Sequence, residues 1–244
     1  MEHLGERLAA IPGVVAVTLG GSRARGEERA GSDWDFGLYY RGSLDVEAVR
    51  RLGFPGEVVE PGTWGRLVNG GAWLTVDGER VDLLYRDLET VEHWLDEAER
   101  GRFEIDLVEG FVAGMATYVL AGEVALAKVL AGELPRPAFP EALRRSAPPR
   151  WDAGARFSVE VAGSAADRGD AASCAGLLAK AAIAAAQARL AERGEWALNE
   201  KGLVPRAGLR EAEGLLAAVG SRPLDLGQTV FRMRIALGFE GPAA

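Results

Sequence analysis

Cysteine and histidine are scarce in this chain. Among its 244 residues there is one cysteine, Cys174, and there are two histidines, His3 and His93. A single cysteine excludes an internal disulfide, and so few thiols and imidazoles leave too small a set of ligands for a Cys/His zinc site. This composition is typical of a protein from a reducing compartment, so we expect a cytoplasmic location.

Positive charge is also in short supply. The 28 Lys and Arg residues are outnumbered by 36 Asp and Glu residues, which gives a formal net charge of −8, and no Lys/Arg-rich run reverses this locally. A surface of this charge repels DNA and RNA. We therefore expect no nucleic-acid partner.

We expect neither a leader nor a membrane span in this sequence. Residues 1–7 carry acidic groups and precede no long apolar run, so they do not resemble a signal peptide. The most apolar stretch, residues 171–190, is interrupted by Lys180, Gln187 and Arg189. These polar positions favour a buried amphipathic helix over a membrane span, and we expect no membrane partner.

What the chain does contain divides into two parts of different character. With 48% hydrophobic residues, it is long enough for one large or two modest domains. Apolar runs of strand length and an Asp77-Gly78 hairpin signal precede Asp87, and no further strand is expected after it. We predict an α+β fold, in which a mixed β-sheet flanked by helices (residues 1–101) is followed by an all-α helical bundle (residues 102–244). The expected strands are 14–19, 33–40, 72–76 and 79–85, the expected helices are 4–11, 45–52, 88–99, 112–130, 153–167, 171–193, 209–218 and 228–237, and prolines 135, 137, 140, 148 and 149 are assigned to a long connection before residue 153.

A glycine-rich turn follows the first expected strand. Gly20-Gly21-Ser22-Arg23-Ala24-Arg25-Gly26 combines paired glycines with one hydroxyl and two arginines. Glycines remove the Cβ atoms that would hold an anion away from backbone N–H groups, and the start of a helix adds its positive dipole end. The turn is therefore suited to a triphosphate, although paired glycines before a helix are common and the pattern alone is not specific.

Carboxylates follow on two of the expected strands. Asp33 and Asp35 are spaced i, i+2, so on a strand they share one face while Trp34 and Phe36 take the other. A neighbouring strand supplies a third carboxylate, Asp82. Two such aspartates can hold a metal pair between them, whereas three clustered carboxylates without metal would repel one another and raise their own pKa values.

The chain resembles the nucleotidyltransferase superfamily, whose members share the catalytic core of DNA polymerase β. The resemblance lies in the order of three elements: the turn, the Asp-x-Asp strand and the strand with Asp82. Within it, the layout is most similar to the aminoglycoside and lincosamide nucleotidyltransferases. The resemblance covers the first hundred residues well and the helical part only loosely. It implies that Gly21, Ser22 and Arg23 bind the phosphates of a nucleoside triphosphate.

The resemblance also implies the metal ligands. Asp33 and Asp35 would hold two Mg²⁺ ions, and Asp82 would complete the set as a ligand and, in some relatives, as the base that takes the proton of the acceptor hydroxyl. In such a site, metal ions about 3.5–4 Å apart clamp the attacking and leaving oxygens of an in-line displacement. Lys201, from the second domain, would neutralise the leaving pyrophosphate.

The resulting hypothesis is a cytoplasmic, Mg²⁺-dependent nucleotidyltransferase. It would move a nucleoside monophosphate, expected to be AMP from ATP, to a hydroxyl of a small molecule such as an aminoglycoside and release pyrophosphate. Two alternatives stay open: transfer to a protein or tRNA, as in toxin and antitoxin relatives, and nucleotide binding without catalysis in a sensor. The oligomeric state, monomer or homodimer, is open as well. Weaker site candidates are Glu104, Asp106, Glu109, Glu123, Trp196 and Asn199, and Cys174 is expected in the core.

Overall fold

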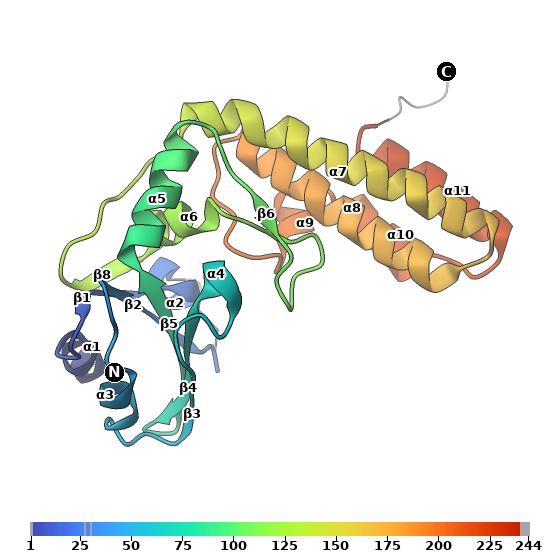
Figure 1. The fold of residues 1–244 in the computed structure, drawn as a ribbon. Helices are drawn as coiled ribbons and strands as arrows, with labels where there is room; N and C mark the ends of the chain where they lie inside the picture. The colour runs from blue at the N-terminus through green and yellow to red at the C-terminus, as the bar shows by residue number, and fades with distance from the viewer. Residues whose placement is uncertain (1, 27, 30, 240–244) are drawn as a thin grey trace. The chain divides into compact units, whose positions relative to one another are not determined.

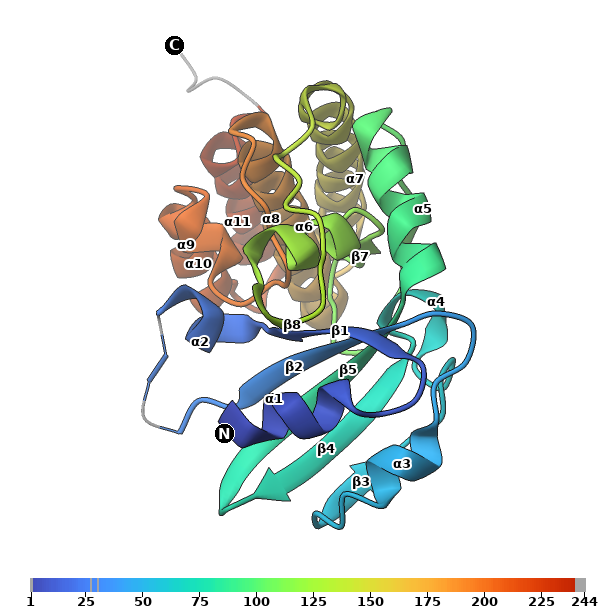
Figure 2. The ribbon, with the colours of Figure 1, turned by 90° about the vertical axis from the view of Figure 1, so that its left-hand side faces the viewer.

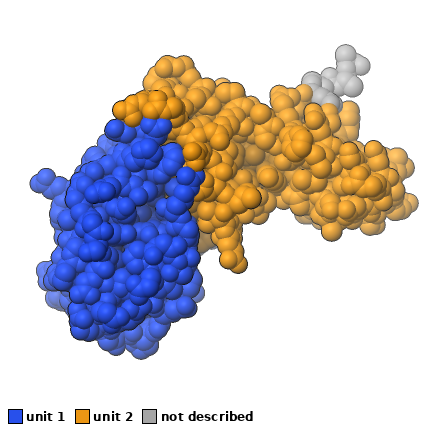
Figure 3. Space-filling view, in the orientation of Figure 1, with its two compact units in different colours: residues 1–97, 120–138 blue, residues 98–119, 139–244 orange. Residues whose placement is uncertain are grey.

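The computed structural model describes residues 2–26, 28–29 and 31–239, and the chain folds into two compact units, shown in Figure 3. Unit 1 comprises residues 1–97 and 120–138, and unit 2 comprises residues 98–119 and 139–244. Segment 120–138, which the sequence analysis assigned to the second domain, is therefore part of unit 1. Met1 of the acidic start and the last residues of the predicted second domain, 240–244, lie outside the described residues.

Unit 1 is built on a six-stranded mixed sheet. Its strands are β1 (Val14–Leu19), β2 (Trp34–Tyr40), β3 (Gly56–Val58), β4 (Gly70–Val76), β5 (Glu79–Asp87) and β8 (Lys128–Ala131), and the helices around it are α1 (Glu2–Ala9), α2 (Gly21–Arg25), α3 (Val46–Arg50), α4 (Gly65–Val68), α5 (Leu88–Glu99) and α6 (Val119–Leu126). The strand order is β3-β4-β5-β2-β1-β8, with β2 and β5 parallel and the other neighbours antiparallel. Helices α1 and α3 lie on the same side of this sheet (Figures 1 and 2).

The core of unit 1 occupies the face of the sheet that α1 and α3 cover. Phe36 and Leu38 of β2, together with Leu83 and Tyr85 of β5, are buried in it. The predicted alternation along β2 is confirmed, because the bulky residues face the core while Asp35 is only half-buried. The other face of the sheet is therefore available for polar side chains.

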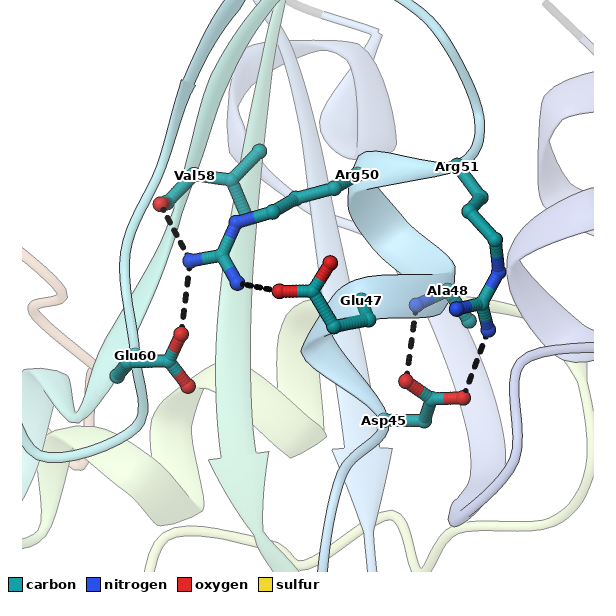
Figure 4. Close-up of polar contacts among 7 residues, drawn as sticks. All are labelled: Asp45, Glu47, Ala48, Arg50, Arg51, Val58 and Glu60. Atoms are coloured by element: carbon teal, nitrogen blue, oxygen red, sulfur yellow. Dashed lines mark hydrogen bonds and ion pairs between the residues drawn. The ribbon is translucent and has the colours of Figure 1, made fainter.

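The edge strand β3 is tied to α3 by charged side chains (Figure 4). Arg50, at the end of α3, donates to the carbonyl oxygen of Val58 (3.2 Å) and to Glu60 Oε1 (2.7 Å). At the start of the same helix, the Asp45 carboxylate accepts a hydrogen bond from the backbone N–H of Ala48 (2.9 Å), the geometry of an N-cap. These contacts fix both ends of a short helix and hold the strand beside it.

The hairpin predicted around Asp77-Gly78 is confirmed as β4 and β5. Both turn residues have positive φ, 53° for Asp77 and 82° for Gly78, as the tight turns of two-residue hairpins require. Asp87 accepts hydrogen bonds from the Glu89 N–H and the Thr90 hydroxyl, and so caps the start of α5.

The long helix predicted over residues 112–130 is wrong. The structure places there β7 (Met115–Ala116), paired with β6 (Ile105–Asp106), then α6 and then β8, which pairs with β1. An apolar run of this length fits a buried helix or a strand equally well by periodicity. The pairing of β8 satisfies backbone groups of β1 that would otherwise be exposed at an edge, and this tertiary effect decides the outcome.

Unit 2 is mainly helical, in agreement with the predicted fold class. Its helices are α7 (Glu141–Asp167), α8 (Ala171–Glu192), α9 (Leu203–Arg206), α10 (Arg210–Ala217) and α11 (Pro223–Ala236). Helix α7 begins earlier than predicted and runs through Pro148 and Pro149, so their assignment to a connection is wrong. Each proline removes one backbone N–H from the helix, but the helix continues past them.

Helix α8 is, within the residues the structure describes, the one helix long and apolar enough by composition to cross a membrane. Half of its most apolar window is buried by the rest of the chain. Its buried positions are mainly alanines, with Leu178, Leu190, Gln187 and Cys174 among them. This is the packing of a core helix, as the sequence analysis expected for residues 171–190.

Candidate functional site

The glycine-rich turn lies directly against Asp35. The Gly20 N–H donates to the Asp35 carbonyl oxygen (2.7 Å), and Gly21, the first residue of α2, has φ +61°. A Cβ atom on Gly21 would lie 1.7 Å from Asp35 Oδ2, which no side chain can do. Glycine is required here for two reasons, the left-handed backbone and the carboxylate that occupies the space of a side chain.

Asp35 and Asp82 are direct neighbours across the parallel pair β2 and β5. Residues in register on adjacent strands point to the same face, so the two carboxylates project side by side from the face opposite the core. Both residues are half-buried. The structure thus brings together the turn and two of the three predicted acids.

Asp33 lies one residue before β2 and faces Arg80 of β5. Arg80 Nε is 2.7 Å from Asp33 Oδ1, and Arg80 Nη2 donates to the Gly31 carbonyl oxygen (3.0 Å). The Arg80 contact does not have hydrogen-bond geometry, so within the described residues Asp33 Oδ1 is buried without a hydrogen-bond donor. Arg80 was not predicted as a site residue, although the alternation along β5 places it with Asp82 on the face opposite the core, here called the free face.

Arg23 holds the segment that carries Asp33. Its Nε donates to the Asp33 carbonyl oxygen (3.2 Å), its Nη2 donates to the Ser32 carbonyl oxygen (2.8 Å), and its guanidinium lies 4.1 Å from the centre of the Trp34 ring. The side chain is only 18% exposed. These contacts make Arg23 a positioning residue for Asp33, and a phosphate contact by Arg23 or by the half-buried Ser22 stays a prediction.

The next strand adds an aromatic residue to the same face. Trp73 of β4 is the register partner of Asp82, and Glu57 of β3 is in turn the partner of Trp73. Trp73 is 50% exposed and packs on Trp64, with ring centres 4.6 Å apart. Sequence reasoning missed both tryptophans as site residues, although the strand alternation could have found Trp73.

The three aspartates carry oxygen donors of the kind that bind divalent metal ions. Asp35 and Asp82 supply adjacent carboxylates, and Asp33 Oδ1 is a buried oxygen without a donor, so the donor chemistry fits a hard divalent cation. However, no group of three or more Asp, Glu, His or Cys side chains close enough to hold a metal occurs in the described part of the chain. Asp33 faces the cationic Arg80 instead of a third carboxylate. Metal binding by these residues stays a prediction.

The predicted residues of unit 2 have local roles. Lys201 is exposed, and its backbone N–H donates to Asn199 Oδ1 (3.0 Å). Trp196 is 8% exposed and packs on Phe139, with ring centres 4.6 Å apart, as a core aromatic does. The neighbouring Glu200 accepts hydrogen bonds from two backbone N–H groups, at residues 112 and 113. A role of Lys201 in binding a triphosphate stays a prediction.

Glu123 is engaged by a buried arginine. The Arg86 side chain, 5% exposed, donates to both carboxylate oxygens of Glu123 at 2.6 and 2.8 Å and to the Val68 carbonyl oxygen at 2.7 Å. Burial, with Glu123 adding to it, raises the pKa of Tyr39 far above its usual range, so this tyrosine on the site face stays protonated. Both carboxylate oxygens of Glu123 are thus occupied by Arg86, and a catalytic role of Glu123 stays a prediction.

Cys174 is fully buried in α8 as a free thiol. Burial raises the pKa of this thiol, which disfavours the nucleophilic thiolate. The predicted assignment of Cys174 to the core is confirmed.

Comparison with known proteins gives two findings and one absence. A nucleotidyltransferase-like protein from Exiguobacterium sibiricum has a similar solved structure, with 13% identity, a TM-score of 0.46, and coverage of 96% of this chain and 72% of that chain. No curated protein matches the chain. Residues 1–97, the part of the chain that carries the turn and the three aspartates, match the family model of the nucleotidyltransferase domain.

Proposed function

We propose that this protein is an Mg²⁺-dependent nucleotidyltransferase that moves AMP from ATP to a hydroxyl of a small molecule and releases pyrophosphate. One observation carries the proposal: Asp35 and Asp82 stand side by side on the free face of the sheet, with Gly21 against Asp35, inside the matched domain. A turn that opens with paired glycines beside paired carboxylates suits a triphosphate bound through cations.

In this proposal, the residues of unit 1 divide the work. Gly21 and Ser22 bind the phosphates through backbone N–H groups and a hydroxyl, and Asp33, Asp35 and Asp82 hold the Mg²⁺ ions. Bound there, the ions supply positive charge that stabilises the attacking and leaving oxygens. Asp82, the acid nearer to β4, accepts the proton of the acceptor hydroxyl as that oxygen attacks the α-phosphorus.

The charge of the chain bears on the class of acceptor. A net charge of −8 supports a cationic small molecule of the aminoglycoside type over tRNA. Transfer to a protein remains the alternative within catalysis, and a non-catalytic sensor the alternative outside it. The presence of Asp33, Asp35 and Asp82 together supports catalysis, because a sensor has no chemical need of the full set. The single cysteine supports action in the cytoplasm.

Pyrophosphate release tests the proposal. Each of the four nucleoside triphosphates is supplied with Mg²⁺, with and without a panel of aminoglycosides and lincosamides, and mass spectrometry then follows both drug and protein. A nucleotidylated drug supports small-molecule transfer. A nucleotidylated protein moves the function to the macromolecular alternative, and binding of triphosphate without any transfer favours the sensor. The Asp35→Asn variant serves as the control for contaminating activity.

A further inference from the structure

We propose that Trp73, Trp64 and Glu57 form the acceptor subsite, and that the acceptor presents a ring with an apolar face and an amino group near the hydroxyl that is modified. This inference rests on the proposed function and deepens it, because it assigns a place and a chemical class to the acceptor. The three residues come from β4, from the turn before α4 and from β3, all within unit 1.

The side chains of the subsite follow a fixed order across the sheet. Cross-strand register aligns Asp35 with Asp82, Asp82 with Trp73, and Trp73 with Glu57. At the other end of this row, Asp35 is joined to the turn by the Gly20 N–H. Because residues in register share a face, the row runs from the phosphate-binding turn through two acids to a tryptophan and a third acid.

The chemistry of in-line displacement determines the side from which the acceptor approaches. The attacking oxygen and the leaving oxygen lie on opposite sides of the α-phosphorus. If the leaving pyrophosphate is held at the turn, and the α-phosphorus at Asp35 and Asp82, the attacking hydroxyl approaches from the side of β4. Trp73 is the residue that stands on that side, directly beside Asp82.

The aromatic surface is supported by neighbouring residues. Trp73 is 50% exposed, whereas its chain neighbours Ala72 and Leu74 are buried. Its ring packs on Trp64, and Trp64 in turn lies over Gly71, where an added Cβ would come within 2.7 Å of the Trp64 ring. Because residue 71 is glycine, there is room for the Trp64 ring, and this ring gives the exposed ring of Trp73 a fixed support.

A negatively charged side chain lies beside the aromatic surface. Glu57 is exposed and lies opposite Trp73 on β3, and that strand is held by Arg50 through the Val58 carbonyl oxygen (Figure 4). A tryptophan face favours the apolar side of a ring and also attracts an ammonium group, and a carboxylate beside it pairs with the same ammonium. An aminated ring with hydroxyls on its edge satisfies both residues.

The experiment measures binding of two probes, kanamycin and Mg·ATP, to the full chain by isothermal titration calorimetry. The variants are Trp73→Ala, the conservative Trp73→Phe, Glu57→Gln and, as a matched control on the same face of the same strand, Thr75→Ala. We expect Trp73→Ala to weaken kanamycin binding about ten-fold, the loss of one well-packed aromatic contact, and to leave Mg·ATP binding within about two-fold. Trp73→Phe should restore most of the affinity, Glu57→Gln should weaken kanamycin binding about three-fold, and Thr75→Ala should change neither probe.

Three outcomes overturn the subsite. Loss of Mg·ATP affinity in Trp73→Ala, with kanamycin unchanged, would assign the ring to the nucleobase instead. Unchanged binding of both probes would remove any role for the ring, and a wild-type chain that does not bind kanamycin would refute the proposed ligand class. Failure of the proposed function looks different: binding of both probes with a Trp73 effect, but no AMP transfer, would sustain the subsite and refute transfer. AMP transfer at an unchanged rate in Trp73→Ala would sustain the proposed function and refute the subsite.

Discussion

The two units differ in how they fill their interiors. The sheet of unit 1 buries large side chains on one face, including Phe36, Leu38, Leu83 and Tyr85. The helices α7 and α8 of unit 2 are packed chiefly through small ones: Ala147, Ala155, Ala162, Ala165 and Ala166 from α7, and Ala181, Ala182, Ala184, Ala185, Ala186, Ala188 and Ala191 from α8.

This difference explains where chemistry can be placed. Strand alternation separates a core face from a free face, so acids such as Asp35 and Asp82 add no polar atoms to the core of unit 1. Alanine packing lets helix backbones approach closely, but it leaves no space for larger side chains. We therefore expect substitutions on the free face of the sheet to change activity with little effect on stability, and substitutions between α7 and α8 to do the opposite.

The largest effect is expected for Asp35→Asn. Loss of a carboxylate that the proposal makes a metal ligand should lower the rate of pyrophosphate release about 10⁴-fold, or about 5.4 kcal/mol of transition-state stabilisation. The variant should be at least as stable as the wild type, because the neighbouring Asp82 loses a like charge beside it. Rate assays and thermal unfolding check the two parts. A variant that keeps a tenth of the activity, or that unfolds much earlier, would break the contrast between the units.

The next effect tests an exception on the same sheet. Glu123→Ala would leave the buried Arg86 with the Val68 carbonyl oxygen but without its carboxylate. A buried charge that loses its partner costs about 3–5 kcal/mol, and we expect the lower end because Glu123 is itself 22% exposed. Urea unfolding at pH 7 measures this loss. The control is Glu92→Ala, since Glu92 pairs with Arg41 at the surface and about half of each side chain is exposed. Equal losses of unfolding free energy in both variants would show that burial of the ion pair does not determine its contribution to stability.

A third prediction concerns the alanine-packed helices. Ala182, fully buried in α8, should not tolerate leucine, and Ala182→Leu is expected to lower the free energy of unfolding by about 2 kcal/mol through overpacking. Ala172→Leu, at an exposed position of the same helix, is the matched control and should be near neutral. Chemical denaturation compares the two. If both variants were equally stable, α7 and α8 would have space to spare and the packing contrast would be wrong.

Sequence alone predicted the parts of the fold that local pattern decides. The strands β1 and β2 and the hairpin around Asp77-Gly78 follow from alternation and turn chemistry, and they are confirmed. The helix predicted over residues 112–130 was wrong because an apolar run alone does not determine whether the segment pairs with a sheet edge. That pairing depends on β1, which is distant in the sequence. The assignment of Pro148 and Pro149 to a connection was wrong for a similar reason. Proline disfavours a helix locally, but the packing of the long helix α7 outweighs that cost.

The same division applies to the site. Alternation on β5 placed Asp82 on the free face of its strand, and the structure adds that Asp35 is its register partner, which no local pattern contains. The contacts of Arg23 and Arg80 with the segment before β2 depend on that register and on loop geometry. The neighbourhood of Trp73 and Asp82 likewise needs the pairing of β4 with β5. Sequence therefore predicted which residues could carry chemistry, and the sheet determined which of them meet.

The smallest effect concerns a feature that both units share. Asp45 caps α3 in unit 1, and Asp170 caps α8 in unit 2 by accepting from the Ser173 N–H (3.0 Å). The hydrogen bond from the Ala48 N–H holds the pKa of Asp45 below its usual value, and hydrogen bonds from Ser173 do the same for Asp170. A carboxyl whose pKa is lower in the folded state stabilises the fold above its unfolded pKa, about 3.9, and loses that contribution as the pH falls through the folded value.

Asp45→Asn and Asp170→Asn keep an N-cap oxygen and remove only the charge. Each variant should therefore unfold at slightly lower temperature than the wild type at pH 7, and the difference should shrink towards zero as the pH is lowered below about 4. Thermal unfolding between pH 7 and pH 3 measures both curves. Both caps accept a backbone N–H, but Asp45 also pairs with Arg51 (2.9 Å), so its variant should show the larger difference at pH 7. A difference that persists in one variant at a pH where the carboxyl is protonated would mean that the substitution acts through something other than loss of the charge. The contrast between the units would then extend beyond their cores.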